Sequence, residues 1–281
     1  MVTGPLLEFA GVHFAYQPER PILTGVDLRV EPGRRLAVVG PNGGGKTTLF
    51  RLAAGSLTPR RGHVTIAGSR VRHTRAGLRA VRQQVQLVLQ DPDDQLFSAS
   101  VRQDVSFGPV NLGLPPEQVR RRCDQALAAL GVTSVADRPT HLLSYGQRKR
   151  VAIAGAVAMR PRLLILDEPT AGLDPVAVEA LLSTLDDLHA AGTTVVLSTH
   201  DVDLAFRWAD TVAVVSGGGV CTVPAAEGLA DPRLLAAAYL LPAWAPLVHR
   251  LLDRIPGLAG SRPRSAAELA ALLTDEPERA T

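Results

Sequence analysis

The segment GPNGGGKTT, residues 40–48, is the most informative part of this sequence. It follows the apolar run RLAVV at 35–39 and leads into KTTLFRLAAG, which is typical of a helix. The segment therefore fits the pattern G-x-x-x-x-G-K-[ST] in the strand, loop and helix context that this pattern requires. Glycines let backbone N–H groups close around phosphate oxygens, and the N-terminus of the following helix favours an anion. The segment predicts a nucleotide phosphate site.

Two side chains of this segment suit a bound nucleotide. Lys46, one of only two lysines in the sequence, would reach the β and γ phosphates, and the Thr47 hydroxyl would hold Mg²⁺. A glycine-rich turn before an ordinary helix is the alternative interpretation, and a lysine at this position argues against it. The predicted nucleotide-binding residues here are Gly40, Pro41, Asn42, Gly43, Gly44, Gly45, Lys46, Thr47 and Thr48.

A second segment, LLILDEP, places two acids at the end of an apolar run. The run at 163–166 is typical of a buried strand, and Asp167 and Glu168 follow at its carboxyl end, where ligands bind in open α/β sheets. Alone, these acids would be read as strand capping. Together with the phosphate loop they predict a Mg²⁺ partner, Asp167 acting through water, and a base that activates the attacking water, Glu168.

Short apolar runs alternate with helix-like stretches over most of the chain, which predicts a parallel sheet built from βα units. Near the N-terminus, LLEFAGVHFAY and GVDLRVEPG instead predict an antiparallel β layer. The predicted fold class is α/β, a P-loop NTPase core with that β layer, an inserted helical subdomain and a small C-terminal helical appendage. The expected boundaries are 1–222 for the nucleotide-binding domain, 95–160 for the insert and 223–281 for the appendage.

The amino-acid composition is typical of a protein with a packed core, and it argues against several other classes of protein. Hydrophobic residues are 46% and charged residues 20% of the 281, and 30 basic against 27 acidic residues leave a net charge of only +3. Aromatic residues are 4%, too few for a surface that stacks on single-stranded nucleic acid. We expect no export signal at the N-terminus, and the longest apolar run, 234–248, is too short to cross a bilayer.

The segment LSYGQRKRVAIAGAV, from Leu143 onward, narrows the choice among nucleotide enzymes. It resembles the signature motif LSGGQ of ATP-binding-cassette (ABC) ATPases, which Ser144, Gly146 and Gln147 match. The resemblance implies that Ser144 and the backbone near Gly146 contact the γ-phosphate of ATP held by the opposite subunit. Tyr145 replaces the first glycine of the motif, and glycine permits a positive φ that tyrosine adopts only at a cost. We expect activity to survive this change.

Further matches to the ABC family follow along the chain. Asp174 in AGLDP resembles the D-loop residue expected across the dimer interface, and His200 in LSTHD resembles the switch histidine near the γ-phosphate. Gln90 resembles the Q-loop glutamine, which senses Mg²⁺ and the attacking water. Tyr16 resembles the aromatic residue that stacks on adenine, with Phe14 as a neighbouring candidate.

The stretch QDPDDQLFSASVRQDVSFGPVNLGLP resembles ATPases of energy-coupling-factor importers, most of all those of the cobalt and nickel type. The resemblance implies ATP and Mg²⁺ as cofactors, a homodimer or a heterodimer with a sister ATPase, and a transmembrane coupling subunit. It further implies a separate substrate-binding membrane subunit, no nucleic acid, and a peripheral position on the cytoplasmic face of the cell membrane. Cobalt or nickel is the first expectation for the substrate, and a vitamin is the second.

The acidic part of that stretch allows three interpretations. It could dock the coupling subunit, with its acids facing arginines and its two apolar residues as an anchor, it could hold Ca²⁺ or Mg²⁺, or it could be a solvated turn. The spacing lacks the glycine and the terminal glutamate of a calcium loop, and we favour docking. The residues concerned are Asp91, Asp93, Asp94, Leu96 and Phe97.

Two other classes of function remain as alternatives. A soluble ABC ATPase that acts on nucleic acid or ribosomes would be expected to carry a second cassette, a long coiled-coil insertion or a basic tail, and none is visible in the sequence. A nucleotide kinase would need neither the signature segment nor His200. We therefore expect the ATP-hydrolysing subunit of a membrane importer.

Overall fold

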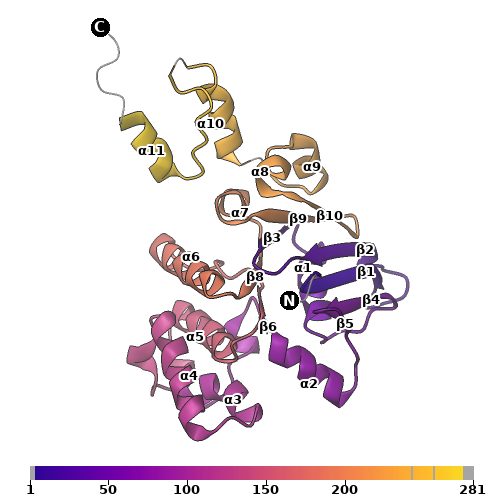
Figure 1. The fold of residues 1–281 in the computed structure, drawn as a ribbon, viewed down its shortest axis with the longest axis vertical. Helices are drawn as coiled ribbons and strands as arrows, with labels where there is room; N and C mark the ends of the chain where they lie inside the picture. Colours follow the sequence, from indigo (N-terminus) through magenta and orange to yellow (C-terminus); the bar gives the residue numbers. More distant parts are fainter. Residues whose placement is uncertain (1–3, 242, 256, 275–281) are drawn as a thin grey trace.

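The computed structural model describes residues 4–241, 243–255 and 257–274, and its β-strands form two sheets (Figure 1). The first sheet is antiparallel, with strand order β2-β1-β4-β5. Its strands are β1 (Leu7–Phe14), β2 (Leu23–Val30), β4 (Arg61–Ile66) and β5 (Ser69–Arg70). This sheet confirms the predicted N-terminal β layer and adds two strands that the sequence pattern had not indicated.

The second sheet has six strands in the order β10-β9-β3-β8-β7-β6. All neighbours pair in parallel except β10, which is antiparallel to β9 at one edge. The strands are β3 (Arg35–Val39), β6 (Val85–Val88), β7 (Leu163–Leu166), β8 (Thr194–Thr199), β9 (Thr211–Ser216) and β10 (Gly219–Pro224). Both β7 and β8 are buried throughout, as expected for parallel strands with covered faces.

The register of the parallel strands brings four predicted site residues to one edge of the sheet. Val39 pairs with Thr199, and Leu166 pairs with both Leu197 and Val88. Carboxyl ends of parallel strands meet at the same edge, so the residues that follow these four strands lie together there. Those residues are Gly40 after β3, Gln90 after β6, Asp167 after β7 and His200 after β8.

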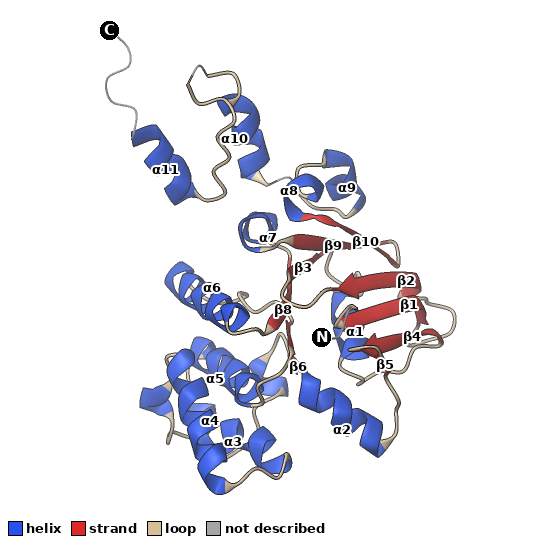
Figure 2. Ribbon diagram, viewed as in Figure 1, coloured by secondary structure: helices blue, strands red, loops and turns tan. Residues whose placement is uncertain are grey.

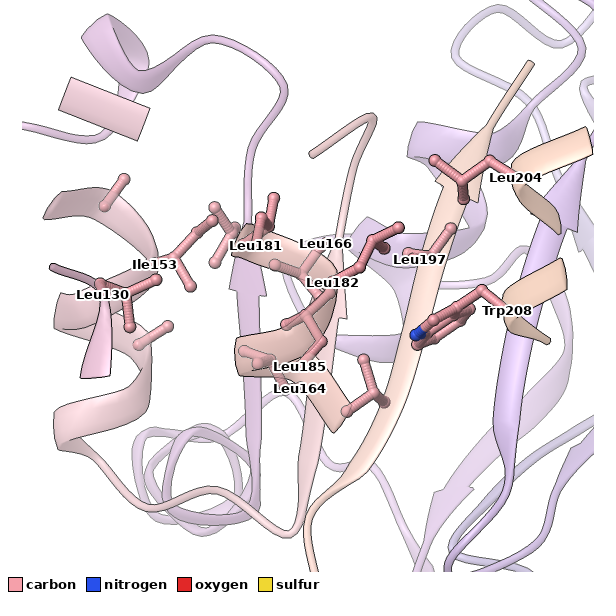
Figure 3. Close-up of a cluster of buried hydrophobic side chains, with 14 of the residues drawn as sticks. Leu130, Ile153, Leu164, Leu166, Leu181, Leu182, Leu185, Leu197, Leu204 and Trp208 are labelled. Carbon is pink, nitrogen blue, oxygen red and sulfur yellow. The ribbon is translucent and has the colours of Figure 1, made fainter. Parts of the chain in front are cut away.

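Helices cover the parallel sheet. Apolar side chains of these helices and of the strands pack together into a buried cluster, which forms the core here (Figure 3). Leu181, Leu182 and Leu185 of α6 (Pro175–Ala190) pack against side chains of β7 and β8, and Trp208 of α7 (Val202–Trp208) lies beside them. Burial of each such leucine contributes roughly 1.5–3 kcal/mol. The helix α1 (Lys46–Ala53) follows the phosphate loop directly, and α2 (Arg75–Gln84) precedes β6.

A helical subdomain is inserted between β6 and β7 (Figure 2). The elements of the insert are the 3₁₀ turns η1 (Pro92–Asp94), η2 (Thr133–Val135) and η3 (Thr140–Leu142) and the helices α3 (Val101–Asn111), α4 (Pro116–Ala129) and α5 (Tyr145–Ala158). In its α4 region, Val119, Cys123, Ala126 and Leu130 are buried and pack into the core.

The C-terminal segment forms short helices at one end of the molecule (Figure 1). They are α8 (Ala225–Gly228), α9 (Pro232–Ala237), α10 (Trp244–Leu252) and α11 (Ala266–Thr274). Arg264 donates hydrogen bonds to the carbonyls of Phe206 and Ala209, which ties this appendage to α7. Within the described ranges, no helix is long and apolar enough to span a membrane.

Candidate active site at the sheet edge

The phosphate loop is closed by its own lysine. The Lys46 ammonium donates to the carbonyls of Gly40 at 2.8 Å and Pro41 at 3.4 Å, and the Gly44 N–H donates to the Pro41 carbonyl at 3.0 Å. Gly40 allows no side chain, because a Cβ there would collide with the carbonyl oxygen of Val215. Lys46 is only 6% exposed and starts α1, so its charge is held at the helix N-terminus beside the sheet edge.

Asp167 and Thr47 form the part of the site that suits a metal ion. The Thr47 hydroxyl donates to Asp167 Oδ2 at 2.5 Å, and the Ser198 hydroxyl donates to Asp167 Oδ1 at 2.6 Å. A carboxylate and a hydroxyl oxygen are the hard ligands that Mg²⁺ prefers. The donor set therefore fits the metal expected from the sequence, with Thr47 and Asp167 as the residues that would hold it.

Glu168 is the most constrained residue of the site. Its side chain lies 3.5 Å from the Lys46 ammonium through Oε1 and 3.0 Å from His200 Nδ1 through Oε2, and its own N–H donates to Ser198 Oγ at 2.8 Å. Its backbone is left-handed, with φ 46°, a conformation that costs about 1–2 kcal/mol outside glycine. Glu168 Oε1 is buried and accepts no hydrogen bond from any described residue, with the Lys46 ammonium as its nearby cation. We name Lys46, Thr47, Asp167, Glu168 and Ser198 the strand-end cluster.

Tyr16 lies next to this cluster and is open to solvent. Its hydroxyl is 3.4 Å from Thr48 Oγ1, and its ring contacts Phe14 edge to face with centroids 5.0 Å apart. Phe14 is 7% exposed, whereas Tyr16 is 54% exposed. Because a stacking surface must be accessible, the geometry favours Tyr16 over Phe14 as the residue for adenine.

Ser144 and Gln147, which we name the signature cap, begin α5. The Ser144 hydroxyl accepts from the Gln147 N–H at 3.3 Å, and the Gln147 side chain accepts from the Ser144 N–H at 3.0 Å. This reciprocal pair is a capping box, which fixes the first turn of the helix. Ser144 is exposed, and no residue of the strand-end cluster hydrogen-bonds to its side chain in the described structure. A Cβ added at the nearby Gly146 would make a tight contact with Leu173, so this position leaves little space for a side chain.

The substitution at Tyr145 carries no backbone penalty. Tyr145 lies in the first turn of α5 and is not among the non-glycine residues of positive φ, so the expected conformational cost is absent. Its ring packs on Gly172, where an added Cβ would come within 2.8 Å of Cε1, and lies 5.6 Å from the Lys149 ammonium. Its hydroxyl reaches the carbonyl of Gln90 at 3.5 Å.

Two predicted site residues make no hydrogen bond to the strand-end cluster. Gln90 is exposed at the end of β6, and its side-chain amide has no hydrogen bond with any described residue. Asp174 is exposed and caps α6 by accepting from the Ala177 N–H at 2.9 Å. Both side chains are accessible to solvent.

The acidic stretch after Gln90 is held by its own chain. Asp91 caps the turn η1, and Asp93 pairs with Arg148 at 2.9 Å. Leu96 packs against the core, whereas Phe97 is 65% exposed. No group of three possible acidic, histidine or cysteine ligands forms anywhere in the described ranges, so the metal interpretation of this stretch gains no support.

The sequence reasoning missed two residues of the site. Ser198 joins the peptide of Glu168 to the carboxylate of Asp167, and its only signal was a polar residue at the end of the apolar run of β8. Lys149, the other of the two lysines in the sequence, lies in no motif that predicted a role for it. It is buried behind Glu168, and burial lowers the pKa of its ammonium to about 8 despite the attraction of the Glu168 carboxylate.

Comparison with known proteins agrees with this geometry. The profile of the ABC transporter family matches residues 23–171. The chain is 58% identical, over 95% of both chains, to a Streptomyces coelicolor protein provisionally named an ABC transporter ATP-binding protein. It is 49% identical to a cobalt import ATP-binding protein of Rhodobacter capsulatus, covering 92% of this chain and 91% of the relative. The structure of cbiO1 from Clostridium perfringens, described as part of the transporter complex cbiONQ, superposes with a TM-score of 0.76 at 37% identity, covering 91% of this chain and 98% of that one.

Proposed function

Because this chain belongs to the ABC transporter family of ATP-hydrolysing subunits, we propose that it powers a membrane importer for a small substrate. The observation that carries this proposal is the chain of contacts from the buried Lys46 to the buried Glu168 and on to the exposed His200, beside the Thr47 and Asp167 pair. This arrangement puts a cation for the phosphates and a carboxylate base at one edge of the sheet. The relatives described above are named for transport, which disfavours the soluble alternative.

In this proposal each residue has one task in ATP hydrolysis. The loop from Gly40 to Thr48 and the Lys46 ammonium bind the phosphates, and Tyr16 stacks on adenine. Glu168 accepts a proton from the attacking water, and His200 holds the Glu168 carboxylate in place. Gln90 contacts the same water. Thr47 and Asp167 would hold Mg²⁺, which when bound would supply positive charge against the phosphates.

The site is completed by a second ATPase subunit. Ser144 and Asp174 are exposed, and a helix N-terminus such as that of α5 presents free N–H groups to an anion. Two chains arranged head to tail would place the signature cap of one chain, including Gly146, against the ATP of the other. Since this chain carries both halves, a homodimer is chemically complete, and a heterodimer with a sister ATPase would use the same contacts.

A membrane subunit is proposed to dock beside the acidic stretch. Phe97 and Phe107 form an exposed aromatic pair, with ring centroids 4.8 Å apart, at a cavity of about 720 Å³ between α2 and α3. Because Asp93 already has an internal partner, the aromatic pair rather than the acids is the better anchor. Leu96, the residue before Phe97, packs against the core, and Asp91 and Asp94 belong to the preceding turn η1. The α2 arginines that line the cavity favour an acidic partner segment; they are Arg75, Arg79 and Arg82.

Cobalt or nickel is the proposed cargo, on the strength of the relative named for cobalt import, and a vitamin is the second candidate. A separate membrane subunit would recognise it. The chain would then sit peripherally on the cytoplasmic face of the membrane, as a domain of residues 1–222 with its insert at 95–160 and an appendage at 223–281.

The proposal is tested by coexpressing the chain with the coupling and substrate-binding subunits of its own genome. We expect copurification and ATP-dependent uptake of radioactive cobalt(II) or nickel(II) into vesicles. The double change Phe97→Ser and Phe107→Ser should abolish copurification, because it removes the apolar anchor, and should spare ATP hydrolysis. Leu251→Ser, at an exposed apolar residue of α10, is the matched control. Unchanged copurification of the double variant would refute the docking surface, and association with ribosomes instead would refute the importer.

A further inference from the structure

Lys149 is a buried cation that the proposed ATP chemistry does not use. It lies on α5, five residues after Ser144, and is 1% exposed. It is also one of only two lysines in the chain, the other being Lys46 of the phosphate loop. An isolated ammonium is costly to bury, so its contacts must offset that cost.

The contacts of Lys149 join three parts of the site. Its ammonium donates to the carbonyl of Glu168 at 2.7 Å and to the carbonyl of Ala171 at 2.9 Å. The ring of Tyr145, the residue that departs from the signature motif, lies 5.6 Å from the same ammonium. One cation on the signature helix is therefore bonded to the backbone that follows the end of β7.

These bonds act on the peptide of the proposed base. Glu168 has a left-handed backbone, and Ser198 Oγ accepts its N–H. Its carbonyl accepts from the Lys149 ammonium at 2.7 Å and from the Ala171 N–H at 3.2 Å, so hydrogen bonds fix both peptide groups that flank this residue, and Lys149 supplies the shorter bond to the carbonyl. A left-handed glutamate persists only where its surroundings impose the conformation. The side chain can then meet Lys46 and His200 from one fixed direction.

The same lysine connects the two halves of the composite site. Ser144 begins the helix that carries Lys149, while Glu168 serves the nucleotide of its own chain. We propose that Lys149 is a positioning residue that holds the Glu168 peptide to the signature helix, so that the base at one ATP site and the signature cap for the other move as one unit. This inference rests on the proposed function.

The test is the kinetics of ATP hydrolysis by the purified chain. Lys149→Met fills similar space but donates no hydrogen bond, and we expect kcat to fall on the order of 10- to 100-fold, since misplaced catalytic groups cost that much. KM for ATP should change little, because Lys46 and Tyr16 are untouched. Lys149→Gln keeps N–H donors without charge and should restore part of the kcat that the methionine variant loses.

Arg264→Met is the matched control, because Arg264 also bonds two carbonyls and faces an aromatic ring, but at the appendage. It should lower the melting temperature without lowering kcat of the folded protein. An unchanged kcat in Lys149→Met would overturn the proposal. A fall in kcat that is fully explained by a smaller fraction of folded protein would overturn it too. If Lys149→Met does not fold, an unchanged kcat in Lys149→Gln together with a raised KM overturns it as well. Failure of the membrane-docking experiment would leave these kinetics unaffected.

Discussion

At the strand-end cluster, Lys46, Asp167 and Glu168 are 2–6% exposed, whereas Ser144 of the signature cap is open to solvent. The cluster is held by side chains from several elements, since the partners of Asp167 come from α1 and β8. Among the described residues, the side chains of the signature cap hydrogen-bond within their own helix turn. One half of the site is thus complete within this chain, and the other half is presented outward. In the proposed mechanism, this difference means that one chain binds ATP and that a second chain is needed for hydrolysis.

The largest expected effect comes from the buried half. Glu168→Gln keeps the shape of the side chain but accepts no proton, so we expect ATP turnover to fall by about 10²- to 10⁴-fold. ATP should still bind, and closed dimers should accumulate on size-exclusion chromatography because reopening needs hydrolysis. Glu179→Gln, at an exposed carboxylate of α6, is the control. Normal turnover by Glu168→Gln would remove the glutamate from its role as base.

Lys46→Ala should have the next largest effect, on binding itself. Hydrogen bonds to charged groups contribute about 1.5–3 kcal/mol, which corresponds to roughly 10- to 100-fold in affinity for ATP. The change also leaves the Glu168 carboxylate without its cation. Titration with a fluorescent ATP analogue measures the loss. Equal affinity in the variant and the parent would show that the lysine does not contact the phosphates.

Tyr145→Gly changes the segment of the exposed signature cap, and it should have the smallest effect of the three changes. The glycine restores the usual signature motif, but it removes the Tyr145 ring that packs on Gly172 and faces the Lys149 ammonium. Glycine in a helix also costs about 1 kcal/mol of stability. We expect a small drop in melting temperature and nearly unchanged turnover. A large gain in turnover would mean that the tyrosine restrains the signature cap.

The sequence was sufficient for the parts of the site that are local in the chain. The phosphate loop, the acids after β7 and the helix that starts at Ser144 each appear as a short pattern, and the parallel sheet brings the first two together. The sheet and its β layer were predicted correctly for the same reason. The strands β4 and β5 and the helix α2 were missed, because their segment mixes arginine and glycine with few apolar residues.

The contacts that cross the fold were not predictable in this way. Lys149 donates to carbonyls that lie 19 and 22 residues further along the chain, and Ser198 bonds residues 30 and 31 positions before it. No local spacing encodes such pairs. The sequence also suggested free acids for docking, but Asp93 turned out to be paired with Arg148, which only the folded chain reveals.

Mixing two inactive variants of the purified chain tests the composite site most directly. Lys46→Ala damages the strand-end cluster, and Ser144→Arg blocks the signature cap, so each variant alone should hydrolyse little ATP. In a mixed dimer one site receives both defects, while the other combines an intact cluster with an intact cap. We predict that ATP turnover returns in part when the two variants are mixed. No recovery, in variants shown by chromatography to form mixed dimers, would contradict it.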